Sequence, residues 1–399
     1  MTTTGIAAPP KAFDADNHYY EATDAFTRFI EPKMAKRAMQ WGEINGRQRL
    51  LVGGKINRFI PNPTFDPVAK PGSLDEYFRG RNPQSQDMRS LFGDLEPIRP
   101  EYRDREARLR VMDEQGLEGC FLFPTLGVGM EESLYHDPEA LIAAFHAFNL
   151  WLEEDWGYAY EDRIFAAPMI SLIDVDAAVV ELELVLSKDA RVVCIKGGPA
   201  HTATGLTSPG DPRFDPFWSL ISEAGVTVGI HSGDAGYGRY IEDWESFGEM
   251  ESFRVGPLRS IMSSDRVPFE TMAALVCHGV FHRFPSVRVA SIESGSDWVL
   301  TLQKKFKKVY GQLESAFPED PMETLRRHVW VAPYYEDDLS AVKAAMSVEH
   351  LLFGSDWPHA EGLAEPRTFA EDLRAQGFTE DEIRLIMTTN GRQLTVRKP

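Results

Sequence analysis

The sequence predicts an α/β fold, a (β/α)8 TIM barrel with a long insertion after the first strand. Short apolar runs rich in β-branched residues alternate with longer stretches of helical periodicity, which is typical of strand–helix units around a parallel sheet. Such runs occur at eight places, residues 12–16, 119–124, 165–170, 191–196, 226–231, 287–293, 328–333 and 350–355. Eight strands with helices between them favour a barrel.

Three of the helices expected between these strands have clear signals. Asp137 and Pro138 form a typical start for a helix over 137–156. Apolar residues recur at helical spacing over 174–187. A third helix is expected over 379–395, after the cap candidate Thr379.

The chain is longer than a TIM barrel requires. Such barrels take about 250 residues, whereas this chain has 399. Most of the surplus falls at 19–100, where Pro, Gly and aromatic residues show weak periodicity before a helix expected near 101–116. A long excursion from the catalytic face is more often a lid or a subunit contact than a linker. We therefore expect one barrel domain over 1–399, with 19–100 as an inserted lid or oligomerisation region.

The composition is that of an acidic globular protein. The chain has 61 Asp and Glu against 42 Lys and Arg, a formal net charge of −19. Such a charge repels nucleic acid phosphates and anionic membrane surfaces, so a small-molecule substrate is the expected partner. The start of the chain, residues 1–10, lacks the pattern of a secretion signal, and no apolar run reaches the roughly 20 residues that span a bilayer. A cytoplasmic location is expected, with three unpaired cysteines.

Polar residues gather at the ends of the expected strands. The active site of a TIM barrel lies at the C-terminal ends of its strands, so residues at these positions are the candidates for chemistry. The first run ends in Asp16-Asn17-His18 with Glu21 close behind, and the other runs that end in such residues contribute Lys196, His231, Glu293 and Asp356, with His359 nearby.

These residues together predict a metal site. Asp16 and His18 are two positions apart on an extended segment, so both project to the same side and can share one cation. Each residue alone has an ordinary alternative, because polar side chains at strand ends often cap loops. Several carboxylates and two imidazoles converging from four strands, however, would repel one another without a cation among them. The oxygen-rich set suits manganese or iron as well as zinc.

Several segments of the chain share the pattern of a known family. These are residues 14–21 (Asp-Ala-Asp-Asn-His-Tyr-Tyr-Glu), 108–116, 121–124, 214–218, 279–285, 354–359 (Gly-Ser-Asp-Trp-Pro-His) and 390–392 (Asn-Gly-Arg). They resemble the amidohydrolase superfamily, in particular the amidohydrolase 2 branch that includes aminocarboxymuconate semialdehyde decarboxylase and related aromatic acid decarboxylases. The resemblance covers most of the chain and is specific for the branch, but not for one reaction.

The resemblance implies roles for individual residues. It places the metal at Asp16, His18, His231 and Asp356, and it makes Asp356 the usual proton shuttle. The chain departs from the pattern twice, with Asp16 in place of a histidine on the first strand and Glu293 in place of a histidine after the sixth. Both changes replace nitrogen by a carboxylate, which favours manganese or iron over zinc.

Further residues extend this expected site. With Glu21 and His359 added, the chain offers ligands for two metal ions, so one or two ions per chain are expected. Lys196 is a candidate for a substrate carboxylate anchor, a carboxylated bridging lysine or a structural cation. Tyr19 and Trp357 are candidates for an apolar wall over the metal, which suggests a cyclic or aromatic substrate.

Three functions compete at this stage. The first is a metal-dependent enzyme that hydrolyses a carbonyl compound through activated water or decarboxylates it without oxidation, with Asp356, His359 and Glu293 as catalytic candidates. The second is a dinuclear iron or iron–manganese monooxygenase, which the carboxylate-rich set with Glu21 and Glu293 also fits. The third is a non-catalytic barrel serving a larger assembly. We expect the protein to form a homo-oligomer or to associate with a related barrel subunit.

Overall fold

The computed structural model describes residues 11–82, 84–86, 88–245, 256–263 and 265–398. The N-terminal residues 1–10, on which the expectation about a secretion signal depends, lie outside these ranges. Within them, no helix combines the length and the apolar character needed to cross a bilayer. The three cysteines are unpaired, as expected.

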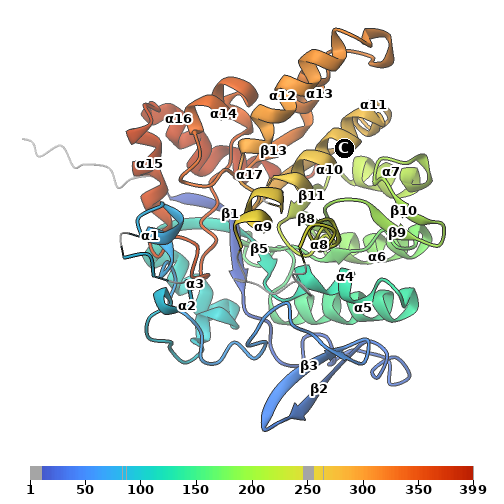
Figure 1. The fold of residues 1–399 in the computed structure, drawn as a ribbon, viewed down its shortest axis with the longest axis vertical. Helices are drawn as coiled ribbons and strands as arrows, with labels where there is room; N and C mark the ends of the chain where they lie inside the picture. The colour runs from blue at the N-terminus through green and yellow to red at the C-terminus, as the bar shows by residue number, and fades with distance from the viewer. Residues whose placement is uncertain (1–10, 83, 87, 246–255, 264, 399) are drawn as a thin grey trace, which may run out of the picture.

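A barrel of parallel strands lies at the centre, with helices around it (Figure 1). The strands run in the order β1-β5-β6 in one sheet and β7-β8-β11-β12-β13 in the other. Their bounds are Ala12–Tyr19 (β1), Leu117–Pro124 (β5), Ile164–Ala166 (β6), Met169–Ile170 (β7), Val192–Lys196 (β8), Thr227–His231 (β11), Arg288–Ile292 (β12) and Val329–Val331 (β13). The expected barrel is therefore confirmed.

Two of the eight expected strands differ in detail. The run at 165–170 divides into β6, which pairs with β5, and β7, which pairs with β8, because Pro168 between them has no amide hydrogen to donate. The run at 350–355 is not a regular strand. It closes the barrel through isolated backbone hydrogen bonds, which Leu352 N donates to the carbonyl of Val331 (2.8 Å) and Ala15 N donates to the carbonyl of Phe353 (2.7 Å).

The helices begin where the sequence signals place them. Asp137, Asp174 and Thr379 each accept a backbone N–H in the first turn of α5, α6 and α16. The main helices are α3 (Arg105–Gln115), α4 (Met130–Leu134), α5 (Pro138–Asp155), α6 (Val175–Ser187), α7 (Asp215–Ala224), α9 (Pro257–Ser263), α10 (Arg266–Cys277), α12 (Asp297–Tyr310), α13 (Pro321–His328), α14 (Leu339–Met346), α15 (Phe369–Ala375), α16 (Glu380–Arg384) and α17 (Asn390–Leu394). Residues 385–389 join α16 to α17 as a π-helical turn, so the helix expected over 379–395 is nearly continuous.

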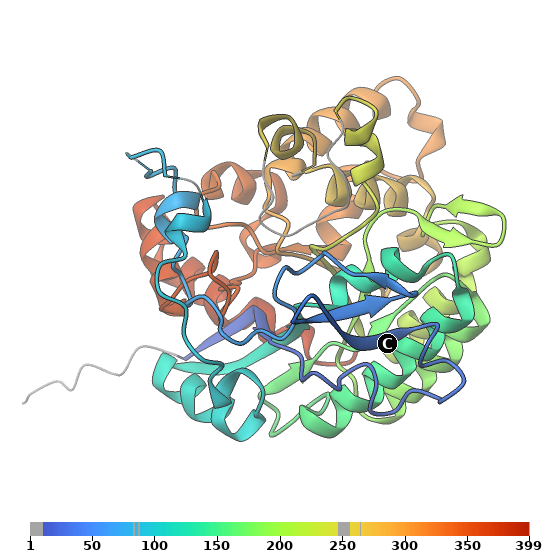
Figure 2. The same cartoon turned by 60° about the horizontal axis from the view of Figure 1, so that its bottom comes forward.

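The segment 19–100 contains a small antiparallel sheet and two short helices. The sheet consists of β2 (Met39–Ile44), β3 (Arg47–Val52) and β4 (Lys55–Ile56), and the helices are α1 (Asp75–Phe78) and α2 (Met88–Leu91). Asn45 and Gly46 both have positive φ, which is the two-residue turn that an Asn-Gly pair favours between antiparallel strands. The sheet extends beyond the barrel at the bottom of Figure 1 and comes forward in Figure 2. Its role as a lid or subunit contact stays a prediction.

Phenylalanine side chains fill part of the barrel interior. Phe13 on β1, Phe121 on β5 and Phe165 on β6 are fully buried and belong to one apolar cluster. The rings of Phe13 and Phe121 meet edge to face at 5.2 Å between centroids. This packing supports the strand ends, where the polar residues lie.

We expect Phe13→Ala to lower the free energy of unfolding by about 3–5 kcal/mol, because it leaves a cavity in a tightly packed interior. Chemical denaturation measures this change. Val180→Ala is the matched control, since Val180 on α6 is 65% exposed and a surface change of this kind shifts stability by only about 0.5 kcal/mol or less. Equal effects of the two substitutions would show that Phe13 does not support the barrel.

Candidate metal centre

The register of the parallel strands brings their C-terminal residues to one level. His231, the last residue of β11, pairs with Lys196 at the end of β8 and with Ile292 at the end of β12. Glu293 follows directly. On the other side of the barrel, Asp356 N donates to the carbonyl of Asp16 on β1 (2.8 Å). Segments far apart in the sequence therefore place their polar side chains at the same end of the barrel.

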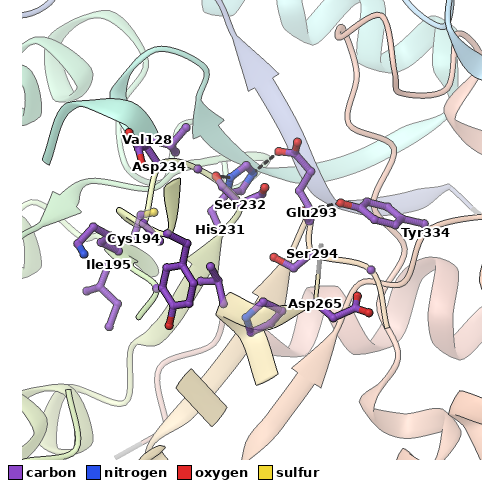
Figure 3. A pocket seen from close by; sticks show the side chains of 18 of the residues that line it. Val128, Cys194, Ile195, His231, Ser232, Asp234, Asp265, Glu293, Ser294 and Tyr334 are labelled. Carbon is purple, nitrogen blue, oxygen red and sulfur yellow. Dashed lines mark hydrogen bonds and ion pairs between the residues drawn. The ribbon is translucent and has the colours of Figure 1, made fainter. Parts of the chain in front are cut away.

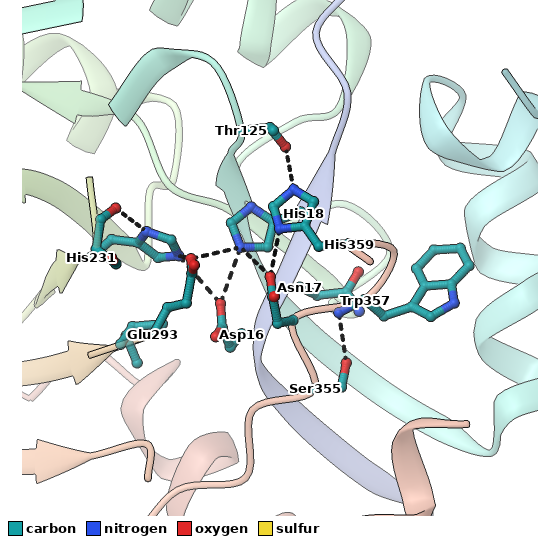
Figure 4. Close-up of polar contacts among 12 residues, drawn as sticks. Asp16, Asn17, His18, Thr125, His231, Glu293, Ser355, Trp357 and His359 are labelled. Atoms are coloured by element: carbon teal, nitrogen blue, oxygen red, sulfur yellow. Dashed lines mark hydrogen bonds and ion pairs between the residues drawn. The ribbon is translucent and has the colours of Figure 1, made fainter. Parts of the chain in front are cut away.

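Four of the predicted residues meet there as one group of candidate ligands, Asp16, His18, His231 and Glu293. His18 Nε2 lies 3.2 Å from Asp16 Oδ1 and 3.6 Å from Glu293 Oε2. His231 Nε2 lies 3.3 Å from the same Asp16 oxygen and 3.2 Å from Glu293 Oε2. Asp356 Oδ1 adds a further carboxylate, 3.3 Å from His18 Nε2. Figure 4 shows the side chains of Asp16, His18, His231 and Glu293 pointing toward one another.

His18 and His231 have different surroundings, and both suit binding to a cation. His231 Nδ1 donates to the carbonyl of Ser232 (2.8 Å), so its hydrogen is on Nδ1 and the lone pair of Nε2 faces the carboxylates. His18 is only 1% exposed, and neither of its ring nitrogens has a hydrogen-bond partner among the described residues. A buried imidazole that makes no hydrogen bond, and whose Nε2 faces several carboxylates, fits a metal ligand.

The electrostatics of the cluster favour positive charge at its centre. Burial alone would lower the pKa of His18, but its close approach to the carboxylates of Asp16 and Glu293 raises it to about 10. The position between these groups therefore binds a positive charge strongly, whether a proton or a metal ion. This agrees with the donor set, in which carboxylate oxygen and neutral imidazole nitrogen both suit a divalent cation.

Two residues of the site have left-handed backbone conformations. Glu293 has φ +48° and Asp356 has φ +56°. This region is unfavourable for residues other than glycine, asparagine and aspartate, and such strain tends to occur at functional sites. In both residues the turn comes directly after a barrel strand or strand-like segment, and their carboxylates reach the cluster of histidines.

A proton lies between Asp356 and His359. Thr125 has one hydroxyl hydrogen and donates it to the carbonyl of Tyr19 (2.8 Å), so it must accept from His359 Nε2, also at 2.8 Å. In the neutral ring, Nδ1 is then an acceptor, and it lies 2.6 Å from Asp356 Oδ1. Burial, and after it the charge of Glu293, raises the pKa of Asp356 well above its usual range. Burial and His18 lower the pKa of His359.

Asp14 joins the first and last segments of the barrel beneath this cluster. Its Oδ1 accepts from Ser355 N (2.9 Å) and Asp16 N (3.1 Å), while Oδ2 accepts from Ser355 Oγ (2.5 Å) and Asn17 Nδ2 (2.9 Å). Asp14 is fully buried. These four hydrogen bonds involve Asp16 itself and Ser355, the residue before Asp356. They therefore fix Asp16 and Asp356 relative to each other.

Arg108 supplies a buried positive charge next to the site. This residue of α3 is fully buried and donates to Asn17 Oδ1 (2.5 Å) and to the carbonyl of His18 (2.7 Å). Its guanidinium lies 4.6 Å from the ring centre of Trp357 and 5.4 Å from that of Trp156. Burial lowers the pKa of Arg108 to about 10, which leaves it charged at neutral pH. It therefore offsets part of the negative charge around the cluster.

Glu21 lies outside the groups of candidate ligands among the described residues. Its Oε1 accepts from Leu126 N (2.8 Å) and Gly127 N (2.9 Å), so it holds the loop after β5. The geometry thus gives no support to Glu21 as a ligand. His359 does approach the cluster, together with His18 and Asp356. Both of its nitrogens, however, are engaged in hydrogen bonds.

Tyr19 and Trp357, the expected apolar wall, lie in the core instead. Tyr19 is fully buried, with its ring stacked on Trp156 at 5.5 Å. It follows His18 on β1, and successive side chains of a strand point to opposite faces, so it points away from the metal side. Trp357 packs on Arg108 and is 3% exposed. Neither residue lines the cavity described next.

A cavity of about 460 Å³ opens beside the cluster, with His231 and Glu293 in its wall. Its volume suits a small-molecule substrate. In the view of Figure 3, Cys194, Ile195 and Asp234 lie on one side, and Glu293, Tyr334 and Asp265 on the other. Lys196 also lines it, as expected for a substrate contact, but its Nζ donates to the carbonyl of Pro199 (3.1 Å) and lies 3.7 Å from Glu132.

Sequence reasoning missed the residues that support the cluster from behind. Asp14, Arg108, Thr125 and Glu361 were given no chemical role. Glu361 meets Glu293 and Asp356 in a third group of candidate ligands, and its Oε2 is buried without a hydrogen-bond partner. Strand periodicity alone could not have identified Asp14, because the pairing of β1 with β5 is irregular between Asp14 and Asn17.

Comparison with known proteins places the chain in a family. A family model described as amidohydrolase matches residues 92–394. The chain belongs to this amidohydrolase family. A solved amidohydrolase from Mycobacterium avium subsp. paratuberculosis K-10 is 44% identical, with a TM-score of 0.92 and coverage of 98% of this chain and 100% of that chain. No curated protein matches the chain significantly.

Two solved decarboxylases share the fold of this amidohydrolase. For 2,6-dihydroxybenzoate decarboxylase from Rhizobium, the TM-score is 0.58 at 18% identity, covering 83% of this chain and 96% of that one. For dihydroxybenzoic acid decarboxylase from Polaromonas sp. JS666, solved with bound manganese and 2-nitroresorcinol, the TM-score is 0.56 at 16% identity, covering 81% and 93%. The family match shows a metal-dependent enzyme and removes the alternative of a non-catalytic barrel.

We expect His231→Ala to lower the affinity for the metal at least tenfold, because it removes a nitrogen whose lone pair faces the cluster. The amount of metal bound per chain should fall accordingly. Elemental analysis after dialysis against a fixed concentration of manganese measures this. His278→Ala is the control, since the exposed side chain of His278 hydrogen-bonds to Ser208, away from the cluster. Unchanged metal content in His231→Ala would remove it from the ligand set.

Metal binding should release a proton from His18 at neutral pH. Its pKa of about 10 in the metal-free protein means that the ring is protonated at pH 7, and a metal ligand must be deprotonated. Apparent affinity should therefore rise by about tenfold per pH unit between pH 7 and 9. Calorimetry in buffers of different ionisation enthalpy counts the released protons. Binding without proton release would contradict a ligand role for His18.

Proposed function

We propose that this amidohydrolase hydrolyses an amide, ester or lactone bond of a small molecule. The observation that carries the proposal is the Asp356–His359 pair, in which a carboxyl group next to the metal cluster shares a proton with a buried imidazole. A group placed in this way can accept a proton from attacking water and return it to the leaving group. The adjoining cavity offers space for the substrate.

Asp16, His18, His231 and Asp356, with Glu293, would hold the divalent cation that the family uses. When bound, such a cation favours the ionised form of the neighbouring carboxylates, lowers the pKa of a water molecule and polarises a carbonyl group. Manganese and iron suit this oxygen-rich set, and zinc is the less favoured choice. Manganese is also bound by the structurally similar decarboxylase from Polaromonas.

The protein's own residues would move and hold the protons. His359 Nδ1 would take the shared proton from Asp356 Oδ1, 2.6 Å away, which leaves an ionised carboxylate whose Oδ2 can accept the proton from water. Thr125 and the carbonyl of Tyr19 keep the His359 ring in one orientation. The same Oδ2 then donates to the departing nitrogen or oxygen, so the two products gain the elements of one water molecule.

Hydrolysis is favoured over decarboxylation by the charge of the site. Asp16, Glu293 and Asp356 are three carboxylates around one cation position, which leaves a net negative charge when all three are ionised. A decarboxylase substrate brings a further carboxylate into this site, and like charges repel strongly where water is excluded. Decarboxylation remains the second candidate because structurally similar proteins carry it out.

The dinuclear monooxygenase is the third candidate. Glu361 joins Glu293 and Asp356 in a group whose ligand atoms lie within 4.8 Å of one another, which would give a second ion a carboxylate site next to the first. Metal stoichiometry separates this candidate from the others, because two irons per chain would favour it over hydrolysis.

Isotope labels distinguish the three reactions on metal-loaded protein. Hydrolysis in H2¹⁸O should place one labelled oxygen in the product acid, with no uptake of O2. Decarboxylation should instead release CO2 and place solvent deuterium on carbon, whereas monooxygenation should incorporate oxygen from O2. A panel of amides, esters, lactones and hydroxybenzoates supplies the substrates. CO2 release or O2 consumption would overturn the hydrolysis proposal.

We expect Asp356→Asn to lower kcat by about 10²–10⁴-fold, because the amide cannot accept the proton from water. Part of the bound metal should remain, since the other four candidate ligands are intact. Asp113→Asn, in which a carboxylate that is 54% exposed is changed, controls for the loss of one negative charge. Wild-type turnover in Asp356→Asn would exclude Asp356 as the proton acceptor.

A further inference from the structure

The cavity beside the metal cluster has one side on which acidic and basic groups are mixed. Lys196 and Arg259 line the cavity together with Glu131 and Asp234. Burial raises the pKa of Asp234, and the charges of Lys196 and Arg259 act against that shift. Lys196 also lies close to Glu132, as described above. On this side, therefore, positive and negative charges compensate one another.

The opposite side carries only negative charge among the described lining residues. We call it the acidic wall, and it consists of Asp265, Asp297, Glu336 and Asp337. Asp265 precedes α10, Asp297 begins α12, and the other two follow β13. Apart from Lys196, Arg259 and His231, the described lining has no basic residue. Arg79, whose charge acts on Glu336, is itself paired with Asp75 and Asp372.

The carboxylates of the acidic wall influence one another. Burial, and after it the charge of Asp297, raises the pKa of Asp265. Burial also raises the pKa of Asp337 to about 6, although Asp337 accepts hydrogen bonds from Ser296 Oγ (2.6 Å) and Tyr334 N (3.0 Å). Burial is the main cause of both shifts, and the charge of Asp297 adds to it in each case. A cation in the cavity would relieve this repulsion.

We propose that the acidic wall binds a positively charged group of the substrate, an ammonium or a guanidinium, while the bond to be cleaved lies at the metal cluster. Glu293 and His231 of the cluster line the same cavity as the wall, so one small molecule can reach both. Tyr334 also lines the cavity next to Asp337, and aromatic rings in a binding cavity favour cationic groups over their faces. The reaction in this inference rests on the proposed function, whereas the charge preference of the cavity does not depend on it.

An anionic substrate fits this cavity poorly. Its carboxylate would approach the acidic wall on one side and the carboxylates of the metal cluster on the other. The lysine that could attract it, Lys196, is held by Pro199 and Glu132. The cavity therefore selects against aromatic acids and in favour of amine-bearing amides or esters.

Binding of three matched probes to the manganese-loaded protein tests the charge preference. Phenethylamine, 2-phenylethanol and 3-phenylpropanoate carry the same ring with a positive, neutral or negative end. Calorimetry should show phenethylamine binding at least tenfold more tightly than the alcohol, with the preference falling as NaCl screens the wall. Because no turnover is needed, the result does not depend on the reaction.

A double variant identifies the residues responsible. Asp265→Asn with Glu336→Gln should abolish the preference for the amine. Asp265 makes no side-chain cap bond to α10, so the variant should fold, and wild-type manganese content verifies this. Asp381→Asn, a change at a carboxylate that is 83% exposed, should keep the preference.

Two outcomes would overturn the inference. One is equal or tighter binding of the alcohol or the carboxylate by wild-type protein. The other is an amine preference that survives in the double variant. If the labelling experiment excludes hydrolysis while the amine preference holds, the reaction is wrong and the charge class of the substrate stands.

Discussion

Buried carboxyl groups at one end of the barrel are the constraint on which the rest of the structure depends. Asp14, Asp16, Glu21 and Asp356 all lie within the protein, and Glu293 reaches the same place. A fold can bury this many carboxyl groups only if protons, hydrogen bonds and cations compensate them. The structure uses backbone amides for Glu21, four donors for Asp14 and the buried Arg108 behind His18. The negative charge that these groups leave uncompensated marks the position where a metal ion would bind.

The scaffold and the chemistry depend on the same hydrogen bonds. The segment 350–355 makes few ladder bonds, so the barrel closes largely through Asp14 and the backbone contacts around it. Because Asp16 and Asp356 are held by these contacts, the geometry of the cluster is set by barrel closure rather than by flexible loops. This is the preorganisation that binding and catalysis require, since the ligands need little rearrangement when a cation enters.

The sequence was sufficient for the barrel and for the cluster, and the reasons are physical. Strands buried on both faces read as apolar runs, and the polar residue that ends each run marks the open face, which located Asp16, His18, His231, Glu293 and Asp356. Tyr19 and Trp357 were misplaced because residue type alone does not say which side of the strand they face. Thr125 and Glu361 could not be found, since their partners His359 and Asp356 come close only in the folded chain. The acidic wall likewise assembles from three segments that are separate in the sequence.

The two left-handed residues have a consequence for how this protein could change. Glu293 and Asp356 aim their carboxylates from turns with positive φ at strand ends, whereas the acidic wall comes from three other segments of the chain. Residues of the acidic wall can therefore be exchanged, which changes the molecules that the cavity accepts. The backbone at the strand ends still holds the metal ligands in place. A library confined to those loops would sample new specificities on an intact catalytic core.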